Sequence, residues 1–205
     1  METKKMILSG IFTRKFSVSV LSLIVYFISH TSLAQDVWSV EVRPGVNVAT
    51  KDLGDADLNT GFGFEGTFSY RFMPHLSAYA GWSWNKFKSD ESFAGTDMDF
   101  EETGYTFGLQ FIHPIGASDL DFIVRAGALY NHIEVEDDDG ELISDSDHGF
   151  GWQAGGGIVF SLSERWRLIP TVRYRSLSRD LTIGNTETEV DLNYVSFGIG
   201  ASLNF

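Results

Sequence analysis

Apolar residues recur at every second position along most of the chain, which is the period of a β-strand. In residues 61–72 the aromatic side chains fall on one face, while glycine, serine, threonine and charged residues fall on the other. No helical period is visible beyond the N-terminal region. Eight segments alternate in this way, namely residues 38–48, 61–72, 76–85, 104–111, 121–131, 150–160, 166–175 and 195–205.

The connections between these segments alternate in length. The short ones carry turn-forming residues and cover 73–75, 114–119 and 162–165. The longer, polar ones lie near 50–59, 89–99, 136–147 and 180–190. Short turns at one end and long loops at the other are typical of membrane barrels, whose strands need roughly 9–11 residues to cross a bilayer obliquely. The pattern therefore predicts an all-β fold, an eight-stranded antiparallel transmembrane up-and-down β-barrel.

The aromatic residues decide which face of this barrel meets lipid. Of the 25 aromatic residues that follow residue 34, 20 lie on the apolar faces. The interior of an eight-stranded barrel is only just wide enough for side chains to fill it, so that many rings do not fit inside. We therefore predict that the apolar faces point to lipid, unlike those of a soluble lipocalin-like barrel. Interfacial belts are expected from Trp82, Trp84, Trp152, Trp166 and Tyr130.

Two prolines fall on the lipid face of the predicted strands. They are Pro44 and Pro170. Proline removes a hydrogen bond from the strand ladder, so we expect a bulge or a strand end at each position.

The opposite faces carry charge into a narrow interior. The charged residues predicted to point inward are Glu41, Arg43, Glu65, Arg71, Asp121, Arg125, Arg167, Arg173 and Arg175. Unpaired charges are costly to bury, so we expect most of these to pair in a packed, salt-bridged lumen. The alternative is a narrow channel or carrier for small solutes or hydrophobic molecules, lined by the same arginines.

Residues 1–34 have the composition of a secretory signal peptide. Their basic residues are Lys4, Lys5, Arg14 and Lys15. An apolar stretch over residues 16–29 follows, and Ser32 and Ala34 place small residues before a cleavage site. We predict that residues 1–34 are cleaved and that 35–205 form the barrel domain; a membrane anchor is the alternative. The chain has no cysteine, which excludes disulfides and a lipoprotein.

Charge is distributed unevenly along the chain. The net charge of −13 disfavours a nucleic-acid partner, because phosphate binding requires a basic surface. Residues 50–59, 89–102, 134–147 and 180–191 hold 21 acidic residues and one base, Lys51. One end of the barrel therefore carries most of the negative charge. Such loops suit bridging to lipopolysaccharide phosphates through divalent cations, or attraction of basic partners.

The strand array, ending in residues 193–205 with alternating apolar residues before the terminal Phe205, resembles the small outer-membrane β-barrel superfamily. Members include the OmpA transmembrane domain, OmpX and the opacity proteins. The resemblance implies a monomer in the outer membrane of a Gram-negative bacterium, in contact with outer-membrane lipids and lipopolysaccharide. It also implies that the barrel-assembly machinery reads Phe205 and the C-terminal strand.

Some barrels of that superfamily modify lipid A, which would require a hydrolase site in this chain. A serine nucleophile needs a histidine that activates it. The histidines after the signal are His75, His113, His132 and His148. Deacylase relatives carry His and Ser close together on a late strand, but residues 173–178 contain serines and no histidine. We predict no enzymatic function.

One loop is a candidate metal site. The carboxylates of Asp137, Asp138, Asp139 and Glu141 suit hard cations such as calcium or magnesium. The spacing around Gly140 does not fit an EF-hand. A solvated anionic loop is favoured, and no cofactor is predicted. The predicted function is therefore a structural or surface-interaction role, performed through acidic extracellular loops.

Overall fold

The computed structural model describes residues 37–183 and 186–205. They form the strands β1 (Trp38–Ala49), β2 (Gly61–Met73), β3 (Leu76–Ser92), β4 (Gly95–Pro114), β5 (Leu120–Glu136), β6 (Leu142–Asp145), β7 (Gly149–Ser161), β8 (Trp166–Ile183) and β9 (Thr186–Asn204). Within these two ranges there is no helix of the length and apolar character needed to cross a membrane. The predicted signal peptide lies outside the described residues.

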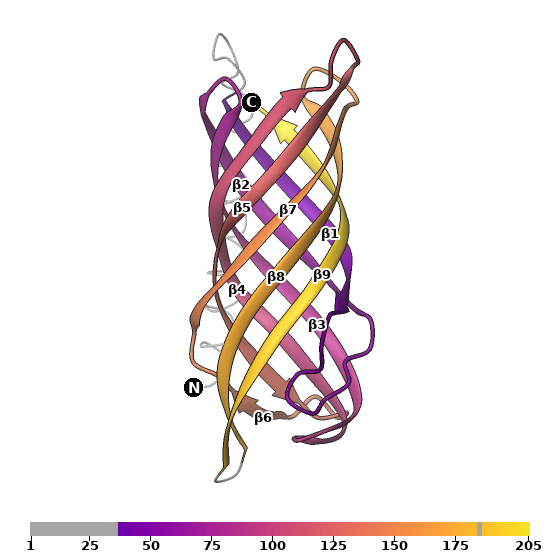
Figure 1. The fold of residues 1–205 in the computed structure, drawn as a ribbon, viewed down its shortest axis with the longest axis vertical. Coiled ribbons are helices and arrows are strands. Elements are labelled where there is room, and N and C mark those ends of the chain that lie inside the picture. The colour runs from indigo at the N-terminus through magenta and orange to yellow at the C-terminus, as the bar shows by residue number, and fades with distance from the viewer. Residues whose placement is uncertain (1–36, 184–185) are drawn as a thin grey trace, which may run out of the picture. The chain divides into compact units, whose positions relative to one another are not determined.

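Eight of these strands close into a ring (Figure 1). Their order is β4-β3-β2-β1-β9-β8-β7-β5, and β4 pairs with β5 to complete it. Each long strand pairs with the long strands before and after it, and β1 pairs with β9. The short strand β6 is added to the end of β5. The prediction of an eight-stranded antiparallel barrel is confirmed, and β6 is an element that the sequence pattern did not indicate.

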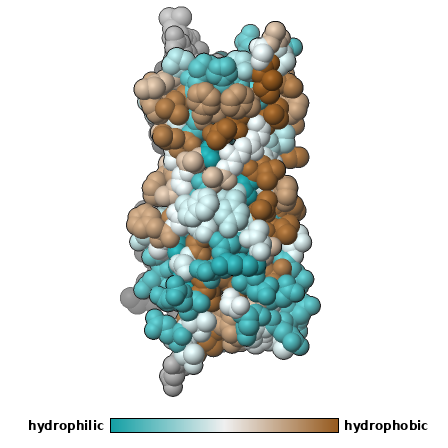
Figure 2. Space-filling view, in the orientation of Figure 1, coloured by the Kyte–Doolittle hydropathy of each residue, from teal (hydrophilic) through white to brown (hydrophobic). Residues whose placement is uncertain are grey.

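Large apolar side chains cover the outside of the barrel. Phe150, for example, is 71% exposed. Figure 2 shows hydrophobic residues over the upper and central parts and hydrophilic ones gathered at the lower end. Aromatic rings contact each other near both edges of this apolar surface. The ring centroids of Trp38 and Phe68 are 5.0 Å apart near the short turns, and those of Phe62 and Trp84 are 5.4 Å apart farther along the barrel. The apolar surface is therefore the lipid-facing one, as predicted.

Both prolines lie inside continuous strands. Pro44 is opposite Phe64 on β2, and Pro170 is opposite Ile199 on β9, in continuous register. On the other side of each proline, the β1–β9 and β7–β8 pairings are interrupted there but resume in the same register. The prediction of a bulge or a strand end at these positions is therefore wrong. The neighbouring residues of each proline remain paired in the closed ring, so the loss of one donor does not end the strand.

Two of the four predicted long loops are hairpins of paired strands. β3 and β4 pair as far as Ser92 and Gly95, across most of the predicted loop 89–99. β8 and β9 pair as far as Ile183 and Thr186, within the predicted loop 180–190. The prediction of loops is wrong here because these polar stretches keep the strand alternation. Their polar residues point outward and their apolar residues point inward, the reverse of the order in the rest of the barrel.

This exchange of faces begins just beyond the aromatic belt. On β3, Trp82 and Trp84 point outward, and two residues later Lys86 takes the outward position while Phe87 is buried inside. An apolar core fills the barrel at this end, formed by Leu53, Ala56, Leu58, Phe87, Phe100, Leu129, Ile133, Val135, Leu177, Leu181, Val190, Leu192 and Tyr194. The inward face, expected to be polar throughout, is thus apolar at the long-loop end.

Residues 50–60, here called the capping loop, complete this apolar core. Leu53 and Ala56 form a small antiparallel bridge and are fully buried, and Leu58 is nearly so. The adjoining Lys51 pairs with Asp191 on β9, with 2.9 Å between Nζ and Oδ2. In Figure 1 this loop follows β1 and lies at the lower end of the barrel. The barrel is therefore closed by protein at its long-loop end.

Candidate functional site

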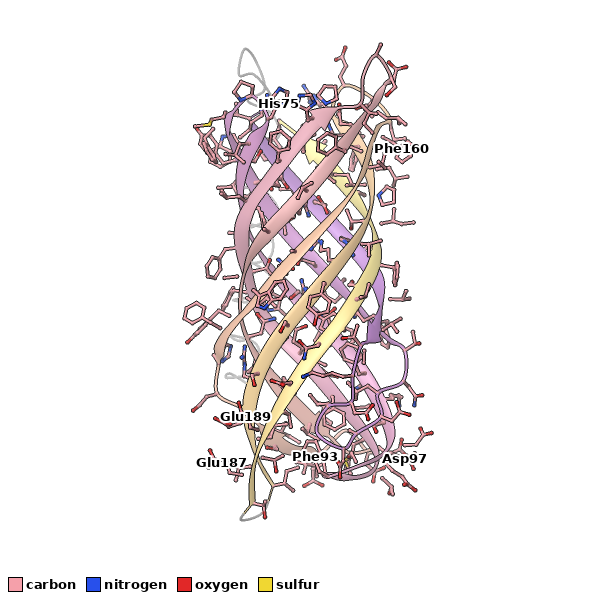
Figure 3. All side chains as sticks on the ribbon, viewed as in Figure 1. His75, Phe93, Asp97, Phe160, Glu187 and Glu189 are labelled. Carbon is pink, nitrogen blue, oxygen red and sulfur yellow. The ribbon has the colours of Figure 1, made fainter. Side chains whose placement is uncertain are left out.

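Two parts of the molecule carry its polar chemistry: the charged interior, and the outer surface at the long-loop end. Figure 3 shows the two ends, with His75 at the short turns and Phe93, Asp97, Glu187 and Glu189 at the opposite end.

The first interior ion pair joins Glu41 on β1 to Arg125 on β5. Both Arg125 Nη atoms donate to the carboxylate, one of them at 3.1 Å. Arg125 Nε donates to Gln110 at 2.9 Å, and the guanidinium lies 5.6 Å from the centre of the Tyr79 ring. Both charged side chains are 4% exposed. The pair therefore spans the lumen and fixes opposite walls of the barrel to each other.

The second interior ion pair is shared by two arginines. Glu65 on β2 accepts hydrogen bonds from Arg173 and Arg175, which are two residues apart on β8. Arg175 Nε also donates to Gln153 at 3.0 Å, and its Nη1 donates to Ser83 at 3.1 Å. Buried ion pairs need such additional hydrogen bonds to offset the loss of hydration. Glu65 is therefore the carboxylate nearest to both buried guanidinium groups.

A third acidic residue in the interior, Glu102, was missed by the sequence analysis. It is fully buried, accepts a hydrogen bond from Asn85 at 2.7 Å, and lies 3.5 Å from Arg175 Nη1. Tyr194 and Asn131 also donate to its carboxylate. The polar composition of residues 89–102 indicated a loop, so an inward position of Glu102 was not predicted. Extending the alternation of β4 by one step beyond Gly104 would have placed Glu102 on the inward face.

Glycines make room for this network on β9. Arg43 donates to Thr171 at 2.6 Å and to Ser196 at 3.2 Å. A Cβ at Gly198 would lie 2.6 Å from Arg43 Cζ, and a Cβ at Gly200 would lie 2.6 Å from Glu41 Oε1. Both separations are shorter than van der Waals contact. The inward glycines of β9 are therefore positions where charged side chains of β1 lie directly on the backbone.

The nine predicted interior charges divide into two groups. The six that are buried are Glu41, Arg43, Glu65, Arg125, Arg173 and Arg175. The other three, Arg71, Asp121 and Arg167, are half-buried and line a cavity of about 200 Å³ at the short-turn end. Glu41 and Arg125 also line this cavity. The cavity thus reaches from the short turns to the first ion pair.

The outer surface just beyond the aromatic belt is highly charged. Lys86 Nζ lies 2.8 Å from Asp99, 2.8 Å from Glu101 and 3.5 Å from Glu136. Burial opposes the charge on Lys86, but the hydrogen bonds to Asp99 and Glu101 raise its pKa above the ordinary value. These side chains lie outside the membrane-spanning part of the strands. One lysine therefore neutralises part of a group of carboxylates just beyond the aromatic belt.

Histidine and carboxylate side chains continue this surface on β5 and β6. His132 Nδ1 lies 2.7 Å from Asp145 Oδ1 and 3.8 Å from Glu134 Oε1. The His148 ring stacks on the His132 ring with centroids 4.3 Å apart. Burial and the nearby carboxylates of Asp145 and Glu101 raise the pKa of Glu134, although His132 opposes this. The partners of His132 are thus acidic groups and rings rather than a serine nucleophile.

The acidic loop proposed as a metal site is held by its own first residue. Asp137 Oδ1 accepts hydrogen bonds from the backbone N–H groups of Asp139 at 3.0 Å and of Glu141 at 2.8 Å. Two groups of side chains with ligand atoms within 4.8 Å of one another lie at the base of this loop instead. They are His132, Glu134 and Asp145, and Glu101, Glu134 and Glu136.

The fold is similar to that of several solved outer-membrane barrels. Neisserial surface protein A is 15% identical, with 83% of this chain and 98% of that chain covered and a TM-score of 0.56. OprG from Pseudomonas aeruginosa is 16% identical, with 82% and 97% covered and a TM-score of 0.56. Outer membrane protein W of E. coli is 16% identical, with 84% and 100% covered and a TM-score of 0.56. At these identities the likeness shows the fold alone.

Sequence comparison identifies the family to which the chain belongs. No curated protein sequence matches it significantly. The model of the outer membrane protein beta-barrel domain matches residues 19–205, which include every described strand. The exposed apolar belt, the closed ring and the alternation of short turns with long hairpins agree with that match. The chain therefore belongs to the outer-membrane β-barrel domain family.

Proposed function

We propose that this protein is a closed, monomeric barrel of the Gram-negative outer membrane that acts through its extracellular surface, in a structural or surface-interaction role. The short turns then face the periplasm, and the capping loop and the hairpins β3–β4 and β8–β9 face outward. The observation that carries this proposal is the filled lumen. Ion pairs centred on Glu41 and Glu65 cross its middle, and the apolar core fills its outer end.

The extracellular surface supplies the chemistry for contact. Its outward side chains are mainly acidic, and Lys86 lies among three of them just beyond the aromatic belt. The phosphates of lipopolysaccharide lie at that depth of the outer leaflet. Carboxylates bind such phosphates through divalent cations, and a lysine binds them directly. Lipopolysaccharide, or a basic partner, is therefore the kind of contact that this surface favours.

Single-channel recording in planar bilayers tests the closed lumen. We expect the purified, folded barrel to show no large, reproducible open level, and a heat-unfolded sample serves as the control. A stable conductance that appears only with the folded protein would overturn the proposal. Surface interaction is tested separately, by comparing the thermal unfolding midpoint in lipopolysaccharide-containing micelles with and without magnesium.

A second candidate function is a carrier for hydrophobic molecules. It is favoured by the apolar core beneath the capping loop, whose Leu53 and Leu58 are side chains from a loop rather than from the barrel wall. Uptake of an apolar dye by liposomes containing the protein tests this function. Uptake that exceeds that of protein-free liposomes would support the carrier and count against a purely structural role.

Export and assembly complete the proposal. The composition of residues 1–34 supports a cleaved signal peptide, and the alternating β9 followed by Phe205 supports recognition by the barrel-assembly machinery. No enzymatic function is proposed. Lipid A mass spectra from cells with and without the gene test that statement, and a difference between them would contradict it.

A further inference from the structure

We propose that His132, Glu134 and Asp145 bind a divalent first-row transition-metal ion, with Zn²⁺ as the representative, on the outer surface of the barrel beyond the aromatic belt. One nitrogen and two carboxylate oxygens of these side chains lie within 4.8 Å of one another. The inference rests on the pairing of β5 with β6 on one side and with β4 on the other. It does not depend on whether the lumen is closed.

The distances between the three side chains fit an ion with small adjustments. His132 Nδ1 lies 2.7 Å from Asp145 Oδ1 and 3.8 Å from Glu134 Oε1. Zinc binds nitrogen and oxygen at about 2.0–2.1 Å, which places neighbouring tetrahedral ligand atoms about 3.3 Å apart. One observed separation is shorter than this and the other is longer. Both differences are below about 1 Å, so small side-chain adjustments would bring these atoms to the spacing of zinc ligands.

The strand register places like charges directly opposite each other at this site. Glu101 faces Glu134, and Glu134 faces Asp145. Such pairs destabilise a sheet when nothing lies between them. Lys86 pairs with Glu101 at 2.8 Å, whereas Glu134 and Asp145 pair with His132. A bound cation would relieve the repulsion that Lys86 does not reach.

The short strand β6 fixes Asp145 in this register without help from an ion. Ser146 exchanges hydrogen bonds with Ile133, its N–H donating to the carbonyl at 2.9 Å and its Oγ accepting from the N–H at 2.8 Å. Ser144 Oγ donates to the carbonyl of Thr182 on β8 at 2.9 Å. Asp145 lies between these two anchored serines. Its carboxylate is therefore held beside His132 before any metal binds.

The donor set selects the class of metal. An imidazole nitrogen with two carboxylate oxygens suits zinc and its neighbours, whereas calcium takes 6–8 oxygen ligands. The His132 side chain is 13% exposed and the Asp145 side chain 46% exposed, so solvent reaches the carboxylate side. The His148 ring, stacked on His132 with an interplanar angle of 15°, limits rotation of the imidazole. Water or a lipid phosphate would fill the remaining coordination position.

Zinc titration of the refolded full chain in detergent micelles, after treatment with EDTA at pH 7.5, tests the site. We expect calorimetry to show about one Zn²⁺ bound per chain and the thermal unfolding midpoint to rise with zinc. His132→Gln and Asp145→Asn should each weaken zinc binding at least about tenfold. Because Asp145→Asn removes a repulsion, that variant should be the more stable chain in EDTA and the less stable one in zinc.

The histidine pair at the other end of the barrel provides the matched control. His75 and His113 have ring centroids 4.6 Å apart, so a nonspecific histidine effect would appear there as well. His113→Asn should leave zinc binding unchanged. The proposal would be overturned if zinc does not stabilise the protein or if calcium has an equal effect. It would also be overturned if His113→Asn loses zinc binding and His132→Gln does not. A gel shift on heating, measured without zinc, checks that each variant is folded.

Discussion

The indole of Trp84 donates a hydrogen bond to Glu101 across the β3–β4 ladder, with 2.6 Å between Nε1 and Oε2. Trp84 belongs to the aromatic belt, and Glu101 belongs to the charged surface that follows it. The same carboxylate pairs with Lys86 at 2.8 Å. This contact marks the level at which the outer surface of the barrel changes from lipid-facing to polar.

Lys86 is predicted to stabilise the long-loop end of the barrel. Lys86→Met would leave Asp99, Glu101 and Glu136 without their shared cation and should reduce the free energy of unfolding by about 1–2 kcal/mol. Denaturant unfolding of the refolded protein in micelles measures this. Lys88→Met is the control, because the Lys88 side chain is 64% exposed and that of Lys86 is 18% exposed. Equal effects of the two substitutions would contradict the prediction.

Glu65 is predicted to be the most sensitive single charge in the lumen. Glu65→Gln leaves Arg173 and Arg175 with only their longer contacts, to Glu41 at 3.8 Å and to Glu102 at 3.5 Å. Breaking a buried pair from one side costs about 3–5 kcal/mol. The denaturant midpoint should fall accordingly. Glu164→Gln, on the exposed turn between β7 and β8, should leave the midpoint unchanged. A Glu65→Gln variant as stable as the wild type would show that the ion pairs do not hold the lumen.

Gly198 and Gly66 are predicted to respond differently to the same methyl group. Gly198→Ala places a Cβ 2.6 Å from Arg43 Cζ and 2.7 Å from the carbonyl oxygen of Pro44. Overpacking of this kind costs about 1–3 kcal/mol. Gly66→Ala places its Cβ with nothing within 4 Å and should change stability by less than about 0.5 kcal/mol. Unfolding curves of the two variants decide the comparison, and the reverse order would refute it.

The capping loop is predicted to depend on Leu53. Leu53→Asp buries a charge in the apolar core, so the loop should leave the barrel and its backbone at the exposed Lys51 should become a substrate for trypsin. Mass spectrometry of the fragments after brief digestion detects cleavage at Lys51. Asp57→Asn, at an exposed position of the same loop, should remain as resistant as the wild type. Leu53→Asp that resists trypsin equally would indicate that the loop is held by other contacts.

Glu134 predicts a specific dependence of stability on pH. Its pKa is raised in the folded protein, so the folded state holds a proton that the unfolded state has released. In metal-free buffer, stability should therefore fall as pH rises from the ordinary carboxylate pKa through the raised one. Glu134→Gln should flatten this part of the profile and be more stable above it. Identical profiles for the two proteins would argue against the raised pKa.

The strand alternation predicted the architecture because lipid imposes one rule on every strand. An outward side chain within the belt must be apolar, so residues such as Phe64 and Val172 reveal the register directly. Beyond the belt, water replaces lipid and the rule reverses. There Phe87 and Ile133 point inward, and the polar residues that alternate with such inward residues suggested loops instead of strands.

The interior was predictable in kind but not in pairing. Alternation identified Glu65, Arg173 and Arg175 as inward residues. It did not indicate that one carboxylate serves both arginines, because that depends on which strands face each other across the lumen. The site at His132 was not predicted for a related reason. Asp145 reaches it through the short strand β6, which lies in a stretch interpreted as an acidic loop.

The pairing of β1 with β9 has a consequence for biosynthesis. Every other pairing of the ring forms between neighbouring long strands and is available as soon as both have been made. The seam between Ser39 and Asn204 cannot form until synthesis has reached the last strand. Until then the incomplete sheet has two open edges and an apolar surface exposed to water, both of which favour aggregation. The open edges and the apolar surface of the incomplete barrel therefore need shielding until β9 has paired with β1.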